Sequence, residues 1–123
     1  MIILDTSVWI EYLRNNPVFF PEISALLENG EILAVECIFG ELLQGVRNKS
    51  EREIIVNFWT YLSKEHYENI IVEAGEYSSK NKLLDHGIGL IDVIILMHGI
   101  KSNSKIWTLD KKFLKIIPEE LRY

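Results

Sequence analysis

The chain has 123 residues, 48% of them hydrophobic, and a formal net charge of −5. Its length suits one domain, which we expect to span residues 1–123, and its negative charge argues against binding nucleic acid through bulk charge. No uncharged apolar stretch reaches the roughly 18 residues of a membrane span, so we expect no contact with a membrane. The only cysteine, Cys37, rules out an internal disulfide and favours a cytoplasmic location.

Strands and helices are predicted to alternate from the first residues onward. The apolar run at 2–4 predicts a short buried strand, and because Asp5 ends it and no basic segment precedes it, it is not a signal peptide. Ser50 followed by Glu53 resembles a capping box at the start of a long helix. The elements expected in this half are helices over 6–14, 21–28, 39–46 and 51–63, with a strand over 31–35.

The second half continues the alternation. Residues 91–100 are apolar nearly all round, as expected of a buried helix. The other elements expected here are a helix over 74–84 and strands over 70–72, 105–109 and 116–117. Strands separated by helices imply a parallel sheet covered on both faces. The expected fold class is therefore α/β, a three-layer α/β/α arrangement with a central, mostly parallel sheet of four to five strands.

Three of the four aspartates lie against apolar runs. Asp5 and Asp110 each end such a run, and Asp92 lies in the first turn of the apolar helix, whereas Asp85 sits in a polar segment. The helix dipole stabilises an anion at Asp92 by about 0.3–1 kcal/mol, less than the several kcal/mol that burying an unpaired carboxylate costs. Asp92 is therefore either an exposed cap or a ligand of a divalent cation shared with Asp5 and Asp110. Mg²⁺ and Mn²⁺ prefer such oxygen ligands.

Basic residues gather in two segments that each follow a candidate acidic position. The simplest interpretation is that they are solvated helix ends and turns, and the alternative is that they contact phosphate groups. The residues that we predict to contact nucleic acid are Arg47, Lys49, Lys111 and Lys112.

Four motifs occur in the order found in a known family. They are Ile-Leu-Asp-Thr-Ser-Val-Trp-Ile over 3–10, Glu-Leu-Leu-Gln-Gly over 41–45, Gly-Leu-Ile-Asp-Val-Ile-Ile-Leu over 89–96, and Trp-Thr-Leu-Asp-Lys-Lys-Phe over 107–113. In these motifs and in length the chain resembles the PIN-domain ribonucleases, and within them the VapC-like toxins of type II toxin–antitoxin pairs.

The resemblance implies a PIN-like fold and a set of site residues. The acidic residues of the site would be Asp5, Glu41, Asp92 and Asp110. Mg²⁺ or Mn²⁺ would be held by the three aspartates, while Glu41 binds it through water or positions the attacking water. Thr6 and Thr108 would be supporting hydroxyls, unless they are an ordinary helix cap and an ordinary strand residue.

Two departures from the family pattern bear on these expectations. Lys112 stands where members often carry a further aspartate, which puts a second fully liganded metal in doubt. Ile94, Ile95 and Leu96 stand where small alanines are common, which alters core packing rather than chemistry.

The function implied is that of a metal-dependent endoribonuclease, with RNA as substrate and a cognate antitoxin protein as partner. The alternative is a catalytically weak PIN module that binds RNA or a partner protein. A phosphorelay receiver would need an aspartate within 47–68, and a dehalogenase-type phosphatase would need one at Ser7, so both are disfavoured. No histidine lies in a context that suggests a general base.

We also expect a homodimer. The family resemblance favours one, and the bulky apolar residues supply more apolar surface than a small core readily hides, unless they all pack inside it. These residues are Val18, Phe19, Phe20, Phe58, Trp59, Tyr61 and Tyr67.

Overall fold

A computed structural model describes all of residues 1–123. Its elements in chain order are β1 (Ile2–Leu4), α1 (Thr6–Leu13), α2 (Phe20–Glu28), β2 (Leu33–Ala34), α3 (Glu36–Gln44), α4 (Lys49–Tyr61), β3 (Ser63–Lys64), α5 (Ile70–Lys80), the 3₁₀ turn η1 (Leu84–His86), α6 (Leu90–Ser102), β4 (Lys105–Trp107), α7 (Lys111–Ile116) and the 3₁₀ turn η2 (Glu119–Leu121). None of the helices has the length and apolar character that crossing a bilayer requires.

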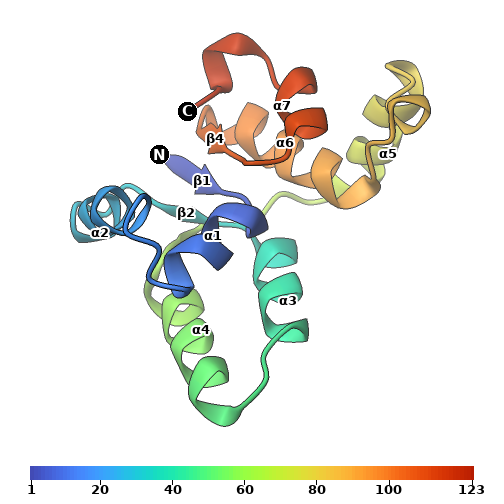
Figure 1. The fold of residues 1–123 in the computed structure, drawn as a ribbon. Helices are drawn as coiled ribbons and strands as arrows, with labels where there is room; N and C mark the ends of the chain where they lie inside the picture. Colours follow the sequence, from blue (N-terminus) through green and yellow to red (C-terminus); the bar gives the residue numbers. More distant parts are fainter.

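The strands form a parallel sheet in the order β3-β2-β1-β4. β1 pairs with β4, β2 pairs with β3, and a bridge between Ile2 and Ile32 joins the two pairs. Helices α1, α3 and α4 lie on one side of the strands, and α6 and α7 lie on the other (Figure 1). Ile3 and Leu4 of β1 are both fully buried, because helices cover both faces of the sheet. The predicted α/β fold with a parallel sheet is confirmed.

The predicted strand at 70–72 was wrong, because these residues begin helix α5. The run of β-branched residues suggested a strand, but Ile71 and Val72 are exposed and Ala74 is fully buried, so the apolar residues do not line a strand face. The third strand is instead β3, which comprises two exposed residues at the edge of the sheet. A strand this short and polar gives no periodic signal in the sequence.

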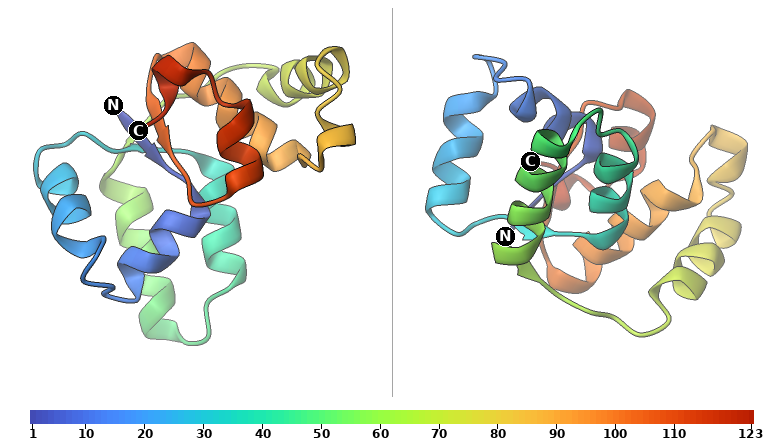
Figure 2. Two further views of the ribbon diagram at one scale, coloured as in Figure 1. Left: turned by 45° about the horizontal axis from the view of Figure 1, so that its top comes forward. Right: turned by 90° about the horizontal axis from the view of Figure 1, so that it is seen from below.

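Two smaller predictions also failed. Ser50 does not cap α4, because the helix starts at Lys49 and the side chain of Asn48 accepts a hydrogen bond from the Glu51 backbone N at 2.9 Å. Residues 116–117 form no strand, since they end α7. The chain reaches the sheet again only at Arg122, which forms an isolated parallel bridge with Ile106. The two chain ends therefore lie near each other beside β1 and β4 (Figure 2).

Helix α6 is apolar on nearly all sides because it lies between two buried clusters. Ile95 and Leu96 belong to the main core, whereas Val93 and Ile94 belong to a smaller cluster with residues of α5 and the following turn. The bulky residues after Asp92 therefore fill core space, as expected from the sequence. Gly99 lets α6 approach β4 closely, because a Cβ there would stand 2.7 Å from Ile106 Cδ1.

Three of the six aromatic residues that suggested a homodimer pack against the main core. Phe19, Phe58 and Trp59 are partly buried against the main core, where Phe58 and Trp59 lie close to Trp9 and Phe39 respectively. The surface argument for a dimer from these three rings was therefore wrong. Val18 and Tyr61 do remain on the surface, with exposed fractions of 76% and 84%.

Candidate metal and nuclease site

Asp5 lies at the carboxyl end of β1, where it caps helix α1. Its Oδ1 accepts a hydrogen bond from the Thr6 backbone N at 2.8 Å. Its Oδ2 accepts from Thr108 Oγ1 at 2.7 Å and from Ser7 Oγ at 3.2 Å. The side chain is only 6% exposed, so these donors take the place of water around the buried carboxylate.

Asp110 occupies the equivalent place after β4, where it caps α7. Its Oδ1 accepts from the backbone N of Lys112 at 2.9 Å and of Phe113 at 3.3 Å. Thr108 links the two aspartates, since its Oγ1 donates to Asp5 and accepts from the Asp110 backbone N at 3.1 Å. Because β1 and β4 are parallel neighbours, their carboxyl ends bring Asp5 and Asp110 to the same edge of the sheet.

Ser7 is a supporting residue that the sequence did not reveal. Its Oγ donates to Asp5 Oδ2 and accepts from the Leu109 backbone N at 3.1 Å, so it ties the start of α1 to the loop after β4. The only signal in the sequence is a hydroxyl two residues after Asp5. That signal gains meaning only when the pairing of β1 with β4 is known.

Glu41 and Asp92 complete the acidic group from two further helices. Thr6 Oγ1 donates to Glu41 Oε1 at 2.7 Å, which joins α1 directly to α3. Asp92 is half-buried in the first turn of α6, and burial raises its pKa to about 6, with further contributions from the charges of Asp5, Asp110 and Glu41. Carboxylates from three other segments thus act on Asp92.

The donors in this site suit a hard divalent cation. Carboxylate and hydroxyl oxygens are the ligands that Mg²⁺ and Mn²⁺ prefer, and a bound cation would relieve the repulsion that raises the pKa of Asp92. In this conformation, no three acidic, histidine or cysteine side chains converge closely enough to enclose an ion. The raised pKa reports interaction over longer distances than metal–ligand bonds, so the two observations agree: the acids are neighbours, but they do not form a closed coordination shell.

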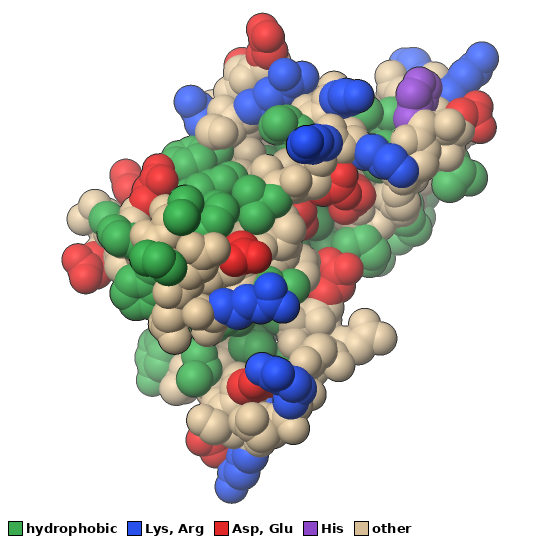
Figure 3. Space-filling model, in the orientation of Figure 1, with side chains coloured by type: hydrophobic (Ala, Val, Ile, Leu, Met, Phe, Trp, Pro, Cys, Tyr) green, Lys and Arg blue, Asp and Glu red, His purple; other side chains and the backbone are tan.

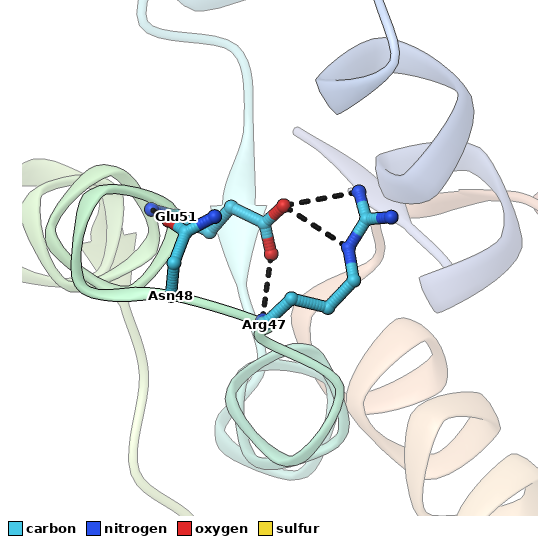
Figure 4. Close-up of polar contacts among 3 residues, drawn as sticks. All are labelled: Arg47, Asn48 and Glu51. Carbon is cyan, nitrogen blue, oxygen red and sulfur yellow. Dashed lines mark hydrogen bonds and ion pairs between the residues drawn. The ribbon is translucent and has the colours of Figure 1, made fainter.

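The basic residues predicted to contact nucleic acid fall into two groups. Arg47 is held by Glu51, with Nη2 3.0 Å from Oε1 and the backbone N donating to Oε2 at 2.8 Å (Figure 4). These contacts, led by the backbone hydrogen bond, lower the pKa of Glu51. Lys49 lies 3.9 Å from Glu53 in a looser, exposed pair. Lys111 and Lys112 are exposed at the start of α7 and form no ion pair.

A cavity of about 420 Å³ adjoins the acidic site. It lies between α1, α3 and α4, and its lining includes Thr6, Ile10, Glu41, Val46 and Arg47. Two other cavities of similar size lie away from the acids. The site therefore has a partly apolar hollow next to Glu41.

His98 is not part of this site. It is buried two turns along α6 from Asp92, it packs against Tyr67, and burial lowers its pKa. Its Nδ1 has no hydrogen-bond partner.

Comparison with known proteins identifies the family. The model of the PIN domain family matches residues 2–117. The chain is 26% identical over 124 residues to the protein named Ribonuclease VapC19 from Mycobacterium tuberculosis strain CDC 1551 / Oshkosh, covering 97% of this chain and 96% of that protein. The protein of the same name from strain ATCC 25618 / H37Rv matches to the same extent. The chain therefore belongs to the PIN domain family, and within it resembles the VapC ribonucleases.

Proposed function

We propose that residues 1–123 form a single PIN-like domain that acts as a metal-dependent endoribonuclease, and that it is the toxin of a type II toxin–antitoxin pair in the cytoplasm. The observation that carries the proposal is the hydrogen-bonded acidic group at the carboxyl ends of β1 and β4, where Thr108 Oγ1 donates to Asp5 and accepts from the Asp110 backbone N. Membership of the PIN domain family and similarity to proteins named as ribonucleases support the same activity.

In this proposal Asp5, Asp92 and Asp110 hold Mg²⁺ or Mn²⁺. When bound, such a cation lowers the pKa of a water and offsets negative charge that develops on phosphorus. Glu41, oriented by Thr6 Oγ1, accepts a hydrogen bond from the attacking water. Ser7 and Thr108 keep the Asp5 carboxylate in place through their hydroxyls. The water oxygen would bond to phosphorus as the bond to the 3′ oxygen breaks, and a proton from the water would pass to that oxygen, so the products would carry a 5′-phosphate and a 3′-hydroxyl.

The test is cleavage of structured RNA by the purified protein with Mg²⁺ or Mn²⁺, with and without EDTA. We expect cleavage that EDTA stops and that Asp5→Asn abolishes. Glu28→Gln is the matched control, because it removes the charge of an exposed acidic residue at the end of α2, outside the site. Cleavage that persists in EDTA, or in the Asp5→Asn variant, would contradict the proposal.

The open arrangement of the carboxylates favours a second candidate, a catalytically weak PIN module that binds RNA or a partner protein. This candidate predicts RNA binding without turnover at any concentration of Mg²⁺ or Mn²⁺. Expression in cells separates the two, because a toxin arrests growth when produced without its partner and a binding module does not.

A further inference from the structure

The basic side chains around the acidic site differ in how free they are to bind another charge. On the α4 side, Arg47 and Lys49 are paired with Glu51 and Glu53. On the α7 side, Lys112 is exposed and has no acidic partner. A cation that is already paired must break that pair before it can bind a phosphate, so the two sides are not equivalent.

Lys112 reaches from α7 to the turn that precedes α6. Its Nζ lies 3.4 Å, and its Cδ 3.7 Å, from the place where a Cβ at Gly87 would stand. Gly87 has a φ of +76°, a left-handed conformation that favours glycine. The missing side chain at Gly87 thus leaves room for Lys112, and the contact joins α7 to the turn five residues before Asp92.

The same turn carries a second free lysine. Lys82 is exposed and unpaired, and its backbone carbonyl lies 3.0 Å from His86 Nδ1 across the turn. Its φ of 53° lies in the left-handed region, where glycine or asparagine fits better than lysine, so the backbone does not require a lysine here. Figure 3 shows several Lys and Arg side chains grouped over α7 and the neighbouring turn, next to acidic side chains.

We propose that the phosphate backbone of the RNA substrate runs over α7 and the turn at residues 80–87, where it contacts Lys112 and Lys82, rather than over α4. This inference rests on the proposed ribonuclease function. The net charge of −5 makes most of the surface unfavourable for RNA, so unpaired lysines on α7 and on the turn that precedes α6 set the direction of the strand. Such contacts position the backbone without selecting its sequence.

The experiment measures RNA binding by the cleavage-deficient Asp5→Asn protein. A short fluorescein-labelled single-stranded RNA is titrated at several salt concentrations in Mg²⁺, and its anisotropy is followed. We expect Lys112→Met and Lys82→Asn each to weaken binding about fivefold at about 0.1 M salt and to reduce the slope of log K against log salt by about 0.7. Lys105→Ala is the control, since it removes an exposed lysine at the amino end of β4, away from the site.

Thermal unfolding separates lost binding from lost structure. Asparagine suits the backbone at residue 82, so Lys82→Asn should unfold at the same or a higher temperature. The inference is overturned if Lys112→Met and Lys82→Asn bind as the parent does, or if Arg47→Ala and Lys49→Ala weaken binding as much. In either case, metal-dependent cleavage by the wild type would show that the ribonuclease proposal still stands. If the wild type neither cleaves nor binds RNA, both fail together.

Discussion

Asp92 is an acidic residue whose ionised form is destabilised in the folded protein. Its pKa is raised to about 6 from the ordinary value of 3.8 by burial and by three neighbouring carboxylates. Between these two pH values the folded state holds a proton that the unfolded state has already released. The contribution of Asp92 to stability is therefore greatest below about pH 4, and it is lost as the pH rises to about 6.

We predict that Asp92→Asn abolishes RNA cleavage but stabilises the metal-free protein at pH 7 by about 1–2 kcal/mol. This value is smaller than a rise in pKa from 3.8 to about 6 would give for a fully buried group, because Asp92 is partly solvated. Urea unfolding in EDTA at several pH values measures this. The difference between wild type and variant should be small at pH 4 and reach its full size above pH 6. An unchanged difference across that range would show that burial and the neighbouring acids do not raise the pKa of Asp92.

Thr108 offers a test of positioning rather than of charge. Its buried hydroxyl donates to Asp5 and accepts from the Asp110 backbone, so Thr108→Val removes both contacts at nearly constant volume. We predict a fall in kcat of about 10–100-fold, the usual cost of losing a group that orients a metal ligand. KM should change little, and Thr108→Ser should recover most of the rate. Equal values of kcat for the Val and Ser variants would show that the Thr108 hydroxyl does not contribute to catalysis.

At the scale of single residues, much of the candidate site could be proposed from the sequence. Asp5, Asp92 and Asp110 are short carboxylates set against apolar runs, and that conflict between charge and burial was visible without a structure. Glu41 was not distinguishable from a solvated helix residue except through the family resemblance. Ser7 could not be found, because its role depends on the Leu109 backbone, which only the sheet brings near.

At the scale of elements, the predictions held where a segment was long and strongly patterned. Helix α6 was anticipated because its apolar character runs nearly all round, as its position between two buried clusters requires. The first turn of helix α5 was predicted as a strand because Ile70, Ile71 and Val72 suit a strand intrinsically, and strand β3 was not predicted. Packing of Ala74 in the second cluster decided the outcome in favour of the helix.

The close packing of α6 against β4 at Gly99 gives a prediction at the scale of elements. Gly99→Ala should destabilise the protein by about 1–3 kcal/mol, because the added methyl would stand 2.7 Å from Ile106 Cδ1 and must displace it. Gly75→Ala is the matched control, since nothing lies within 4 Å of a Cβ there and alanine favours the exposed interior of α5 by about 0.5–1 kcal/mol. Chemical denaturation should therefore give changes of opposite sign, and two changes of the same sign would contradict this packing.

At the scale of the whole molecule, the homodimer remains a prediction, but we now expect its interface to lie on α5. The rings of Phe58 and Trp59 pack against the main core, whereas Ile71 and Val72 at the start of α5 are 58% and 62% exposed. We expect a dimer by light scattering at micromolar concentration, and a monomer when both α5 residues are changed to serine. Val18→Ser should stay dimeric. A monomeric wild type would end the dimer prediction.

A partner protein that inhibits cleavage would have to cover the acidic residues, and the cavity beside them offers a place for a segment of it to bind. The hollow between α1, α3 and α4 has apolar walls, including Ile10 and Val46, and Glu41 lies at its edge. An apolar stretch of an antitoxin could fill it, while an adjoining arginine pairs with the carboxylates in two-point fashion. Such a segment would exclude both the cation and the RNA phosphate, and burial of the hollow would contribute most of the affinity.

We therefore predict that the wild-type protein arrests growth when produced alone in its native host, and that Asp5→Asn relieves the arrest. A neighbouring gene product with a disordered tail should restore growth and co-purify with the protein. Ile10→Asp should weaken that complex, because it places a charge on the apolar wall without touching the acids, and it should leave the protein toxic even when the partner is present. Growth that continues normally despite abundant wild-type protein would contradict the toxin assignment and favour the weak binding module.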